Sequence, residues 1–129
     1  MTLDRKYLSF AMFYVIAGMC LGVYMGASQN HTQHVTHAHI LLVGFVVSFI
    51  YGIIHKLWLT RPNPLLANIQ LILHQVAAAI MFVALALLFS GHFEAEKIEP
   101  ILGMSSVGVL LGAILMLVLV VQSRHHRSA

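Results

Sequence analysis

Charged residues are scarce in this sequence: only 9% of its 129 residues are Asp, Glu, Lys or Arg, whereas 60% are hydrophobic. Water-soluble domains carry roughly 25% charged residues, so this scarcity excludes an ordinary soluble enzyme or binding domain. Cys20 is the single cysteine, which excludes an intrachain disulfide. Nearly all glycines lie inside apolar stretches, which excludes a glycine-rich phosphate-binding loop.

The chain consists largely of four apolar stretches, at residues 7–27, 40–59, 65–89 and 101–122. About 20 apolar residues are enough to cross a bilayer as a helix. We therefore predict an all-α membrane protein in which residues 1–129 form a single domain. In this domain, four transmembrane helices form an antiparallel up-and-down bundle. The first stretch is longer than the apolar region of a signal peptide, so we interpret it as a membrane span.

The charges that are present predict an orientation in the membrane. Six of the seven basic residues fall on one side of the predicted bundle, whereas Glu94, Glu96 and Glu99 fall on the other. The six are Arg5, Lys6, Lys56, Arg61, Arg124 and Arg127. The positive-inside rule then places both termini in the cytoplasm, and residues 31–39 on the periplasmic side of a bacterial inner membrane. The isoelectric point near 9.4 follows from this topology and predicts no nucleic-acid partner.

Small residues recur at four-residue spacing in three of the predicted helices. The series are Gly18, Gly22 and Gly26, then Gly44, Ser48 and Gly52, and finally Gly108 and Gly112. Such ridges allow helices to approach closely. They are consistent either with dense packing inside one chain or with contacts between copies in a homo-oligomer.

Four of the nine histidines, His31, His34, His37 and His39, lie directly before the apolar run that begins at Ile40. Ionisable groups at the end of a membrane helix are functional candidates. Imidazole readily binds haem iron, copper and zinc. We therefore expect the function to depend on this segment.

The spacing of His37 and His39 allows two arrangements. In a helix, a step of two residues turns the side chain by roughly 200°, so the two rings would face opposite sides and serve separate sites. In an extended segment they would share a side and could chelate one copper or zinc ion. The apolar run from Ile40 to Ile50 favours the helical case.

His74 is the histidine predicted to lie deepest in the membrane, about 13 Å into the third helix at 1.5 Å per residue. Gln70 lies one turn away and Gln75 is adjacent. A polar residue at this depth must face the bundle interior or a cavity. A metal ligand, a proton relay and an interhelical hydrogen bond are all consistent with this position.

The other candidate histidines lie nearer the membrane surfaces. His55 follows Tyr51 by one turn near the cytoplasmic end of the second helix, where Trp58 and Lys56 are typical interfacial anchors. On the outer side, His31, His34 and His92 could complete an exposed copper or zinc site.

The segment from His37 to Gly52 has a His-x-His pair opening an apolar helix, then Gly44-Phe45, then Gly52. It resembles the haem-binding helix of the haem–copper oxidase superfamily, above all the C-family oxidases, and next the nitric oxide reductases. The resemblance implies that His37 and His39 are axial ligands of two haems. It also implies that the chain corresponds to one four-helix arc of a twelve-span catalytic subunit, so that three copies would form a ring. In that family an adjacent His-His pair on the next helix binds copper, whereas this chain has His74-Gln75, which departs from the pattern of a complete haem–copper centre.

We therefore expect a membrane-bound haem b protein, a cytochrome, with copper as a second candidate cofactor. Electron transfer and binding of a diatomic gas both fit, with a quinol or a cytochrome as electron donor, and catalysis is left open. One alternative is a protein that binds copper or zinc through the outer histidines. Another is an accessory subunit of a respiratory complex.

Overall fold

The computed structural model describes the backbone of residues 1–127 and the side chains as far as Ser123. Every regular element in this range is helical: α1 (Leu3–Ser28), α2 (His34–His39), the π-helix η1 (Ile40–Val46), α3 (Val47–Leu57), α4 (Pro64–Ser90) and α5 (Ala95–Arg127). Four helical stretches are long and apolar enough to cross a membrane, namely Leu3–Ser28, His34–Leu57, Pro64–Ser90 and Ala95–Ser123. The prediction of an all-helical chain with four such helices is confirmed over the described residues.

The helix limits differ most from the apolar stretches at two places. The second spanning helix begins at His34 rather than at residue 40, so the polar histidine segment forms its first turns. The helix α5 begins at Ala95 rather than at residue 101, and Pro100 lies inside it. Apolar runs mark only the part of a helix that lies in hydrocarbon, whereas the helical backbone continues into the polar interface at both places.

The π-helix η1 is a second difference from the sequence prediction, because its residues match an ordinary α-helical apolar pattern. It directly follows His39 and covers Ile40–Val46. At its end the backbone N–H of Val47 donates to the carbonyl of Leu42, five residues back. Segments of π-helix often occur at functional sites, and this one directly adjoins the His-x-His pair.

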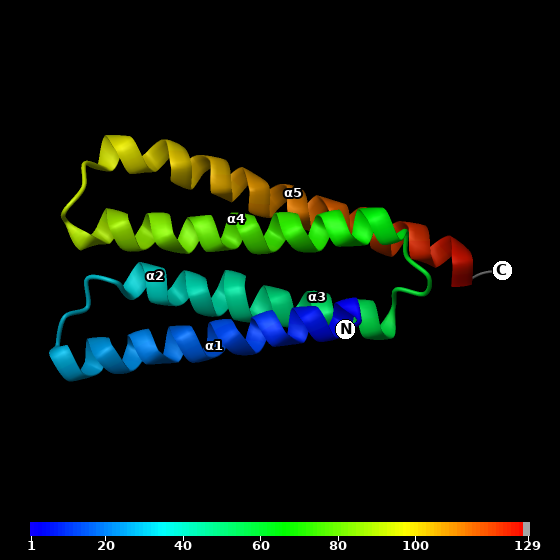
Figure 1. Cartoon of the computed structure of the whole chain (residues 1–129), viewed down its shortest axis with the longest axis horizontal. Coiled ribbons are helices and arrows are strands. Elements are labelled where there is room, and N and C mark those ends of the chain that lie inside the picture. The colour runs from blue at the N-terminus through cyan, green and yellow to red at the C-terminus, as the bar shows by residue number, and fades with distance from the viewer. Residues whose placement is uncertain (128–129) are drawn as a thin grey trace.

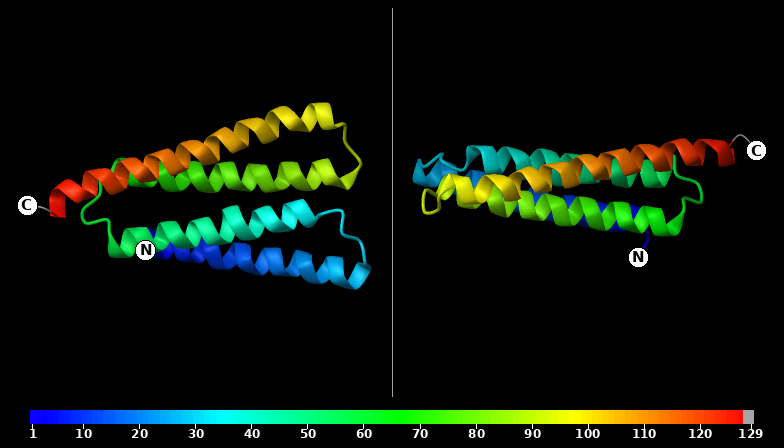
Figure 2. Two further views of the ribbon diagram at one scale, coloured as in Figure 1. Left: turned by 180° about the vertical axis from the view of Figure 1, so that it is seen from behind. Right: turned by 90° about the horizontal axis from the view of Figure 1, so that it is seen from above.

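The spanning helices form two hairpins. In the first, α1 packs along α2, η1 and α3, whereas in the second α4 packs along α5. The hairpins meet where α4 lies against α2, η1 and α1. Figure 1 shows the four spanning helices side by side in the order α1, α3, α4, α5, and Figure 2 shows that this layer is thinner than it is wide. The start of α1 and the end of α5 lie at the same end of the molecule (Figure 1).

A short link joins the hairpins, and its sequence explains where α4 begins. The Asn63 side chain accepts hydrogen bonds from the backbone N–H groups of Leu65 and Leu66, at 3.0 and 3.2 Å. Pro64 occupies the first helical position, where its missing N–H costs nothing. An asparagine cap followed by proline is a strong helix-start signal, so this boundary agrees closely with the sequence prediction.

The small-residue ridges are used inside the chain. A Cβ added at Gly18, Gly22, Gly44, Gly52, Gly108 or Gly112 would lie within 4 Å of another helix of the same chain. Gly26 has nothing within that distance. Dense packing within one chain therefore accounts for most of the ridge residues, and the ridges no longer favour contacts between copies.

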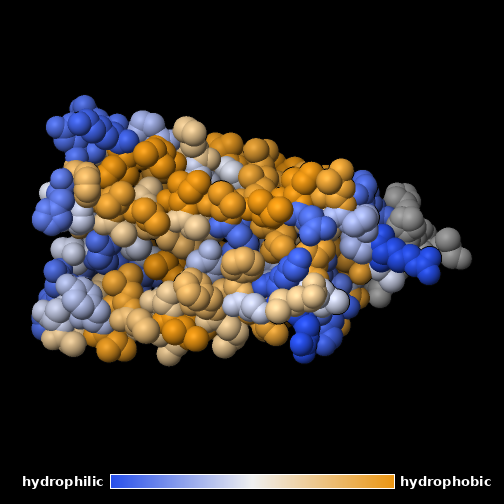
Figure 3. Space-filling view, in the orientation of Figure 1, coloured by the Kyte–Doolittle hydropathy of each residue, from blue (hydrophilic) through white to orange (hydrophobic). Residues whose placement is uncertain are grey.

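The surface has the pattern of a membrane protein. On the face that Figure 3 shows, apolar residues cover most of the middle of the molecule, and hydrophilic residues gather at its two ends. Large apolar side chains are exposed on every spanning helix, for example Phe13 at 66%, Ile72 at 60% and Leu117 at 61%. Such exposure is costly in water and neutral in lipid. The side chains of Arg124 and Arg127, which contribute to the predicted orientation, lie outside the described residues.

Candidate haem-ligating histidines and the buried polar core

Three histidines at the start of the second spanning helix hold their rings in the same way. The Nδ1 atoms of His34, His37 and His39 lie 3.0, 2.8 and 2.9 Å from the backbone carbonyls of His31, Gly18 and Val35. A carbonyl only accepts, so each Nδ1 carries a proton, and in the neutral form of the ring the lone pair is then on Nε2. Histidines that bind metals usually donate their other ring N–H in this way. The backbone thus sets all three rings in the tautomer that a ligand needs.

His37 points toward α1. Its Nδ1 donates to the Gly18 carbonyl at 2.8 Å, and its ring lies against Gly22, where an added Cβ would come within 2.9 Å of Cε1. The glycine ridge of α1 therefore has a specific use, because only a residue without a side chain leaves space for this imidazole. The ring is half-buried between the two helices of the first hairpin.

His39 is held by its own helix rather than by a neighbour. Its Nδ1 donates to the Val35 carbonyl, one turn back. Both His37 and His39 lie in α2, so the helical arrangement favoured by the sequence is confirmed. A step of two residues then separates the two side chains by roughly 200°. One ion chelated by both rings is excluded by this geometry, and two separate ligand positions are consistent with it.

His74 is fully buried, as its predicted depth required. Its Nε2 lies 3.3 Å from the carbonyl of Val43 in η1, and its ring packs edge-on against Tyr51 with centroids 5.1 Å apart. Among the described residues, nothing is hydrogen-bonded to its Nδ1. The interhelical hydrogen bond is the predicted role that the geometry displays, and a lone pair remains on the other ring nitrogen.

Gln75, the residue that follows His74, is also buried. Its Nε2 donates to the hydroxyl of Ser48 at 3.0 Å, which ties α4 to α3. Within the described part of the chain its Oε1 has no hydrogen-bond partner. This glutamine joins the two hairpins and presents one unsatisfied carbonyl oxygen to the interior.

A buried polar core continues from His74 toward the end of the molecule that holds the N-terminus. The Tyr7 hydroxyl donates to Gln70 Oε1, and Gln70 Nε2 donates to the Gly112 carbonyl at 3.0 Å. Tyr7 also packs edge-on against Tyr51 and stacks on His55, with centroids 5.7 and 5.5 Å apart. His55 is thus buried against Tyr7 rather than placed as an interfacial anchor. Sequence reasoning missed Tyr7, because nothing in the sequence indicates that the start of α1 meets the second turn of α4.

The remaining outer histidines are not brought together. His31 precedes the helix, His34 lies in its first turn, and both are exposed, as is His92 in the link before α5. No group of three or more His, Cys, Asp or Glu side chains that could hold a metal ion occurs among the described residues. Within the described part of the chain, the outer histidines therefore do not form a three-ligand cluster.

Replacing Gln70 with leucine is expected to lower the free energy of unfolding by about 1–3 kcal/mol. The substitution leaves the Tyr7 hydroxyl and the Gly112 carbonyl without their partner in a buried position. Thermal or denaturant-induced unfolding in detergent, followed by circular dichroism, measures the change. In the Gln70→Leu variant, adding Tyr7→Phe should lower the free energy of unfolding by less than Tyr7→Phe does in the wild type. The reason is that the Tyr7 hydroxyl has already lost its partner.

Asn68→Leu is the matched control on the same helix. The Asn68 side chain is exposed and donates only to the Pro64 carbonyl of its own helix, at 2.7 Å. A change within about 0.5 kcal/mol is expected there. Equal losses at positions 68 and 70 would show that the buried bonds contribute no particular stability.

No protein-family model, no curated protein and no solved structure matches this chain.

Proposed function

We propose that this chain is a membrane-bound haem b protein, a cytochrome, in which His37 and His39 would hold the haem iron. The observation that supports the proposal is that both imidazoles make the same hydrogen bond, from Nδ1 to a backbone carbonyl. Each ring donates its Nδ1 proton to a backbone carbonyl, at 2.8 and 2.9 Å, and keeps the Nε2 lone pair. Iron needs this lone pair, and a hydrogen bond at Nδ1 strengthens the ring as a ligand.

The surroundings of the pair suit a large apolar macrocycle. Val23 and Tyr24 directly follow Gly22, against which the His37 ring lies, and Leu42 follows His39 by three residues. Their side chains are 72, 54 and 59% exposed. Burial between apolar helices is a main determinant of haem redox potential. Bound haem would supply one-electron redox chemistry or the capacity to bind a diatomic gas. The role of the protein chain would be to hold the two imidazole rings in one tautomer and to exclude water from the haem.

The finer features of the proposal follow the resemblance to the haem–copper oxidases. Both termini lie in the cytoplasm of a bacterial cell, and residues 31–39 face the periplasm. The row of four helices corresponds to one arc of the oxidase catalytic subunit, and three copies close the ring. Support comes from the His-x-His helix and from the side-by-side order of the helices (Figure 1). A quinol or a cytochrome donates the electrons.

His74 has a different role in this proposal. It is fully buried and already bonded through Nε2 to the Val43 carbonyl. A ligand role would use Nδ1, the atom without a partner. The neighbouring residue that would complete a copper pair is Gln75, whose amide binds Ser48 instead. We therefore propose haem iron, without a complete haem–copper centre, as the cofactor chemistry.

The test is a reduced-minus-oxidised visible spectrum of the full chain, purified in detergent from cells supplied with haem. The proposal predicts a Soret band and an α band of histidine-ligated haem b in the purified protein. A folded but colourless protein would contradict it. Tight copper or zinc binding by that colourless protein would then establish the metal-binding alternative, and recovery only with a partner complex would favour the accessory-subunit alternative.

A further inference from the structure

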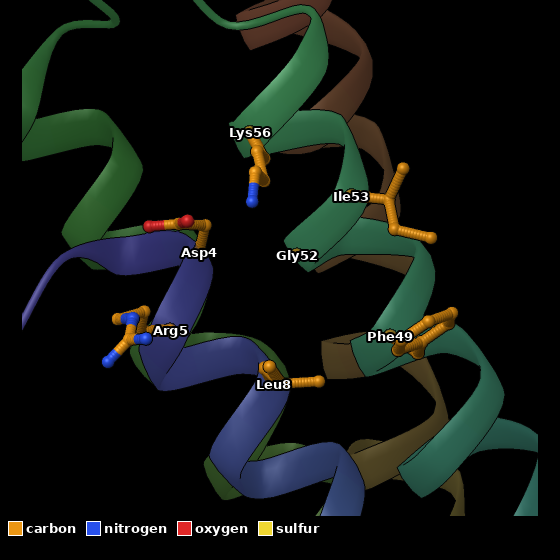
Figure 4. A pocket seen from close by; sticks show the side chains of 7 residues that line it. All are labelled: Asp4, Arg5, Leu8, Phe49, Gly52, Ile53 and Lys56. Atoms are coloured by element: carbon orange, nitrogen blue, oxygen red, sulfur yellow. The ribbon is translucent and has the colours of Figure 1, made fainter.

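A cavity of about 220 Å³ opens between the start of α1 and the end of α3 (Figure 4). Its volume is several times the ~30 Å³ that one water molecule occupies in the liquid. Its wall combines the charged side chains of Asp4, Arg5 and Lys56 with the apolar side chains of Leu8, Phe49 and Ile53. It lies at one end of two membrane-spanning helices, where the polar and apolar parts of a lipid would meet.

Gly52 allows the two helices to approach beside this cavity. A Cβ at position 52 would lie 3.2 Å from the Asp4 carbonyl and 3.2 Å from Cβ of Tyr7. The backbone of α3 is thus pressed against the first turns of α1, and the larger side chains of the cavity stand around this contact. Figure 4 shows Lys56 reaching from α3 into the space between the helices, above Gly52.

The opposite charges at the mouth are near one another but not paired. The Asp4 carboxylate accepts a hydrogen bond from the Thr2 side chain, and the Lys56 ammonium is close enough to act on it electrostatically. The one ion pair within 4.0 Å among the described residues is Lys97–Glu94, at the other end of the molecule. Asp4 and Lys56 therefore present a negative and a positive group on either side of an open space.

We propose that this cavity binds the head group of phosphatidylethanolamine. Lys56 binds the phosphate, Asp4 accepts hydrogen bonds from the ammonium, and Leu8, Phe49 and Ile53 contact the first part of an acyl chain. Basic pockets between membrane helices are typical sites for lipid phosphates. The proposal is independent of haem binding.

The carboxylate selects ethanolamine among the common head groups. A phosphatidylglycerol head group has hydroxyls that can donate hydrogen bonds to Asp4, but it brings no positive charge to the carboxylate. A phosphatidylcholine head group carries a positive charge but has no N–H, so it donates no hydrogen bond to Asp4. The ammonium of ethanolamine has both the charge and the donors.

The full chain in detergent, titrated separately with phosphatidylethanolamine, phosphatidylglycerol and phosphatidylcholine, tests this by native mass spectrometry. We expect one phosphatidylethanolamine per chain to be retained in preference to the other two lipids. Lys56→Gln should weaken retention about fivefold, the contribution of one basic residue near a lipid surface. Asp4→Leu, which removes both the charge and the hydrogen-bond acceptor, should abolish the preference for ethanolamine over choline while binding of the phosphate persists.

Two control variants distinguish a site from general surface charge. Lys6→Gln removes a positive charge from the same end of α1 without touching the cavity, and Glu96→Gln removes a negative charge at the far end. Both should bind lipid as the wild type does, and circular dichroism checks that every variant is folded. Equal retention of all three lipids by the wild type would overturn the proposal. So would equal losses in Lys6→Gln and Lys56→Gln.

Discussion

Replacing His37 or His39 alone is expected to remove about half of the bound haem, and replacing both is expected to remove all of it. A two-residue helical step of roughly 200° prevents the two rings from holding one iron, so each single variant loses the haem that its own ring binds. Changes outside the first coordination sphere alone weaken metal binding by about 10–100-fold, and loss of the ligand should cost at least as much. Haem per protein, measured as the pyridine haemochrome, gives the result.

The substitutions are chosen so that loss of haem can be distinguished from unfolding of the chain. His37 bridges α2 to α1 through the Gly18 carbonyl, so His37→Asn, which keeps an amide donor, accompanies His37→Ala. His39 bonds only its own helix, and His39→Ala breaks no contact between helices. The matched control is His34→Ala, because the His34 ring has the same hydrogen bond to a backbone carbonyl but is exposed. Full haem content in both single variants, or an equal loss at His34, would contradict the assignment.

The sequence predicts the helices of this chain well, because hydrocarbon imposes a simple rule on length and composition. Each of the four apolar stretches corresponds to a helix, and Asn63-Pro64 marks the start of α4 correctly. The sequence does not predict where helices continue into the polar interface, as at His34 and Ala95. The π-helix is also not predictable, since it differs from an α-helix in hydrogen bonding and not in its apolar pattern.

The candidate site is predictable in its residue types and less so in its contacts. His37 and His39 stand out because imidazole is rare at the mouth of an apolar helix, and Gly22 has the spacing of a packing ridge. The position of the His37 ring on Gly22 depends on how α1 and α2 are staggered, which no local pattern encodes. The same holds for Tyr7 and Gln70, which are 63 residues apart in the chain. Their pairing follows from the way the two hairpins meet.

Gly108→Ala is expected to destabilise the chain although alanine favours helix formation. A Cβ at position 108 would lie 2.8 Å from Cβ of Ala77, the closest contact between α5 and α4 at any glycine of α5. Neither atom belongs to a flexible side chain, so the helices themselves must separate. Overpacking of this kind costs about 1–3 kcal/mol. Denaturant-induced unfolding in detergent, followed by circular dichroism, should show this loss.

Gly103→Ala on the same helix is expected to leave the stability unchanged or to raise it. Nothing lies within 4 Å of a Cβ at position 103, so the substitution changes only the backbone preference, which favours alanine by up to about 1 kcal/mol. The two variants therefore add the same methyl group to the same helix five positions apart, and only the contact with Ala77 distinguishes them. Destabilisation at 108 together with a neutral or stabilising effect at 103 would establish that α4 and α5 pack through this small-residue contact within one chain. Destabilisation at 103 as large as that at 108 would instead show that position 103 is covered, and a second copy of the chain on that face of α5 would be the natural candidate.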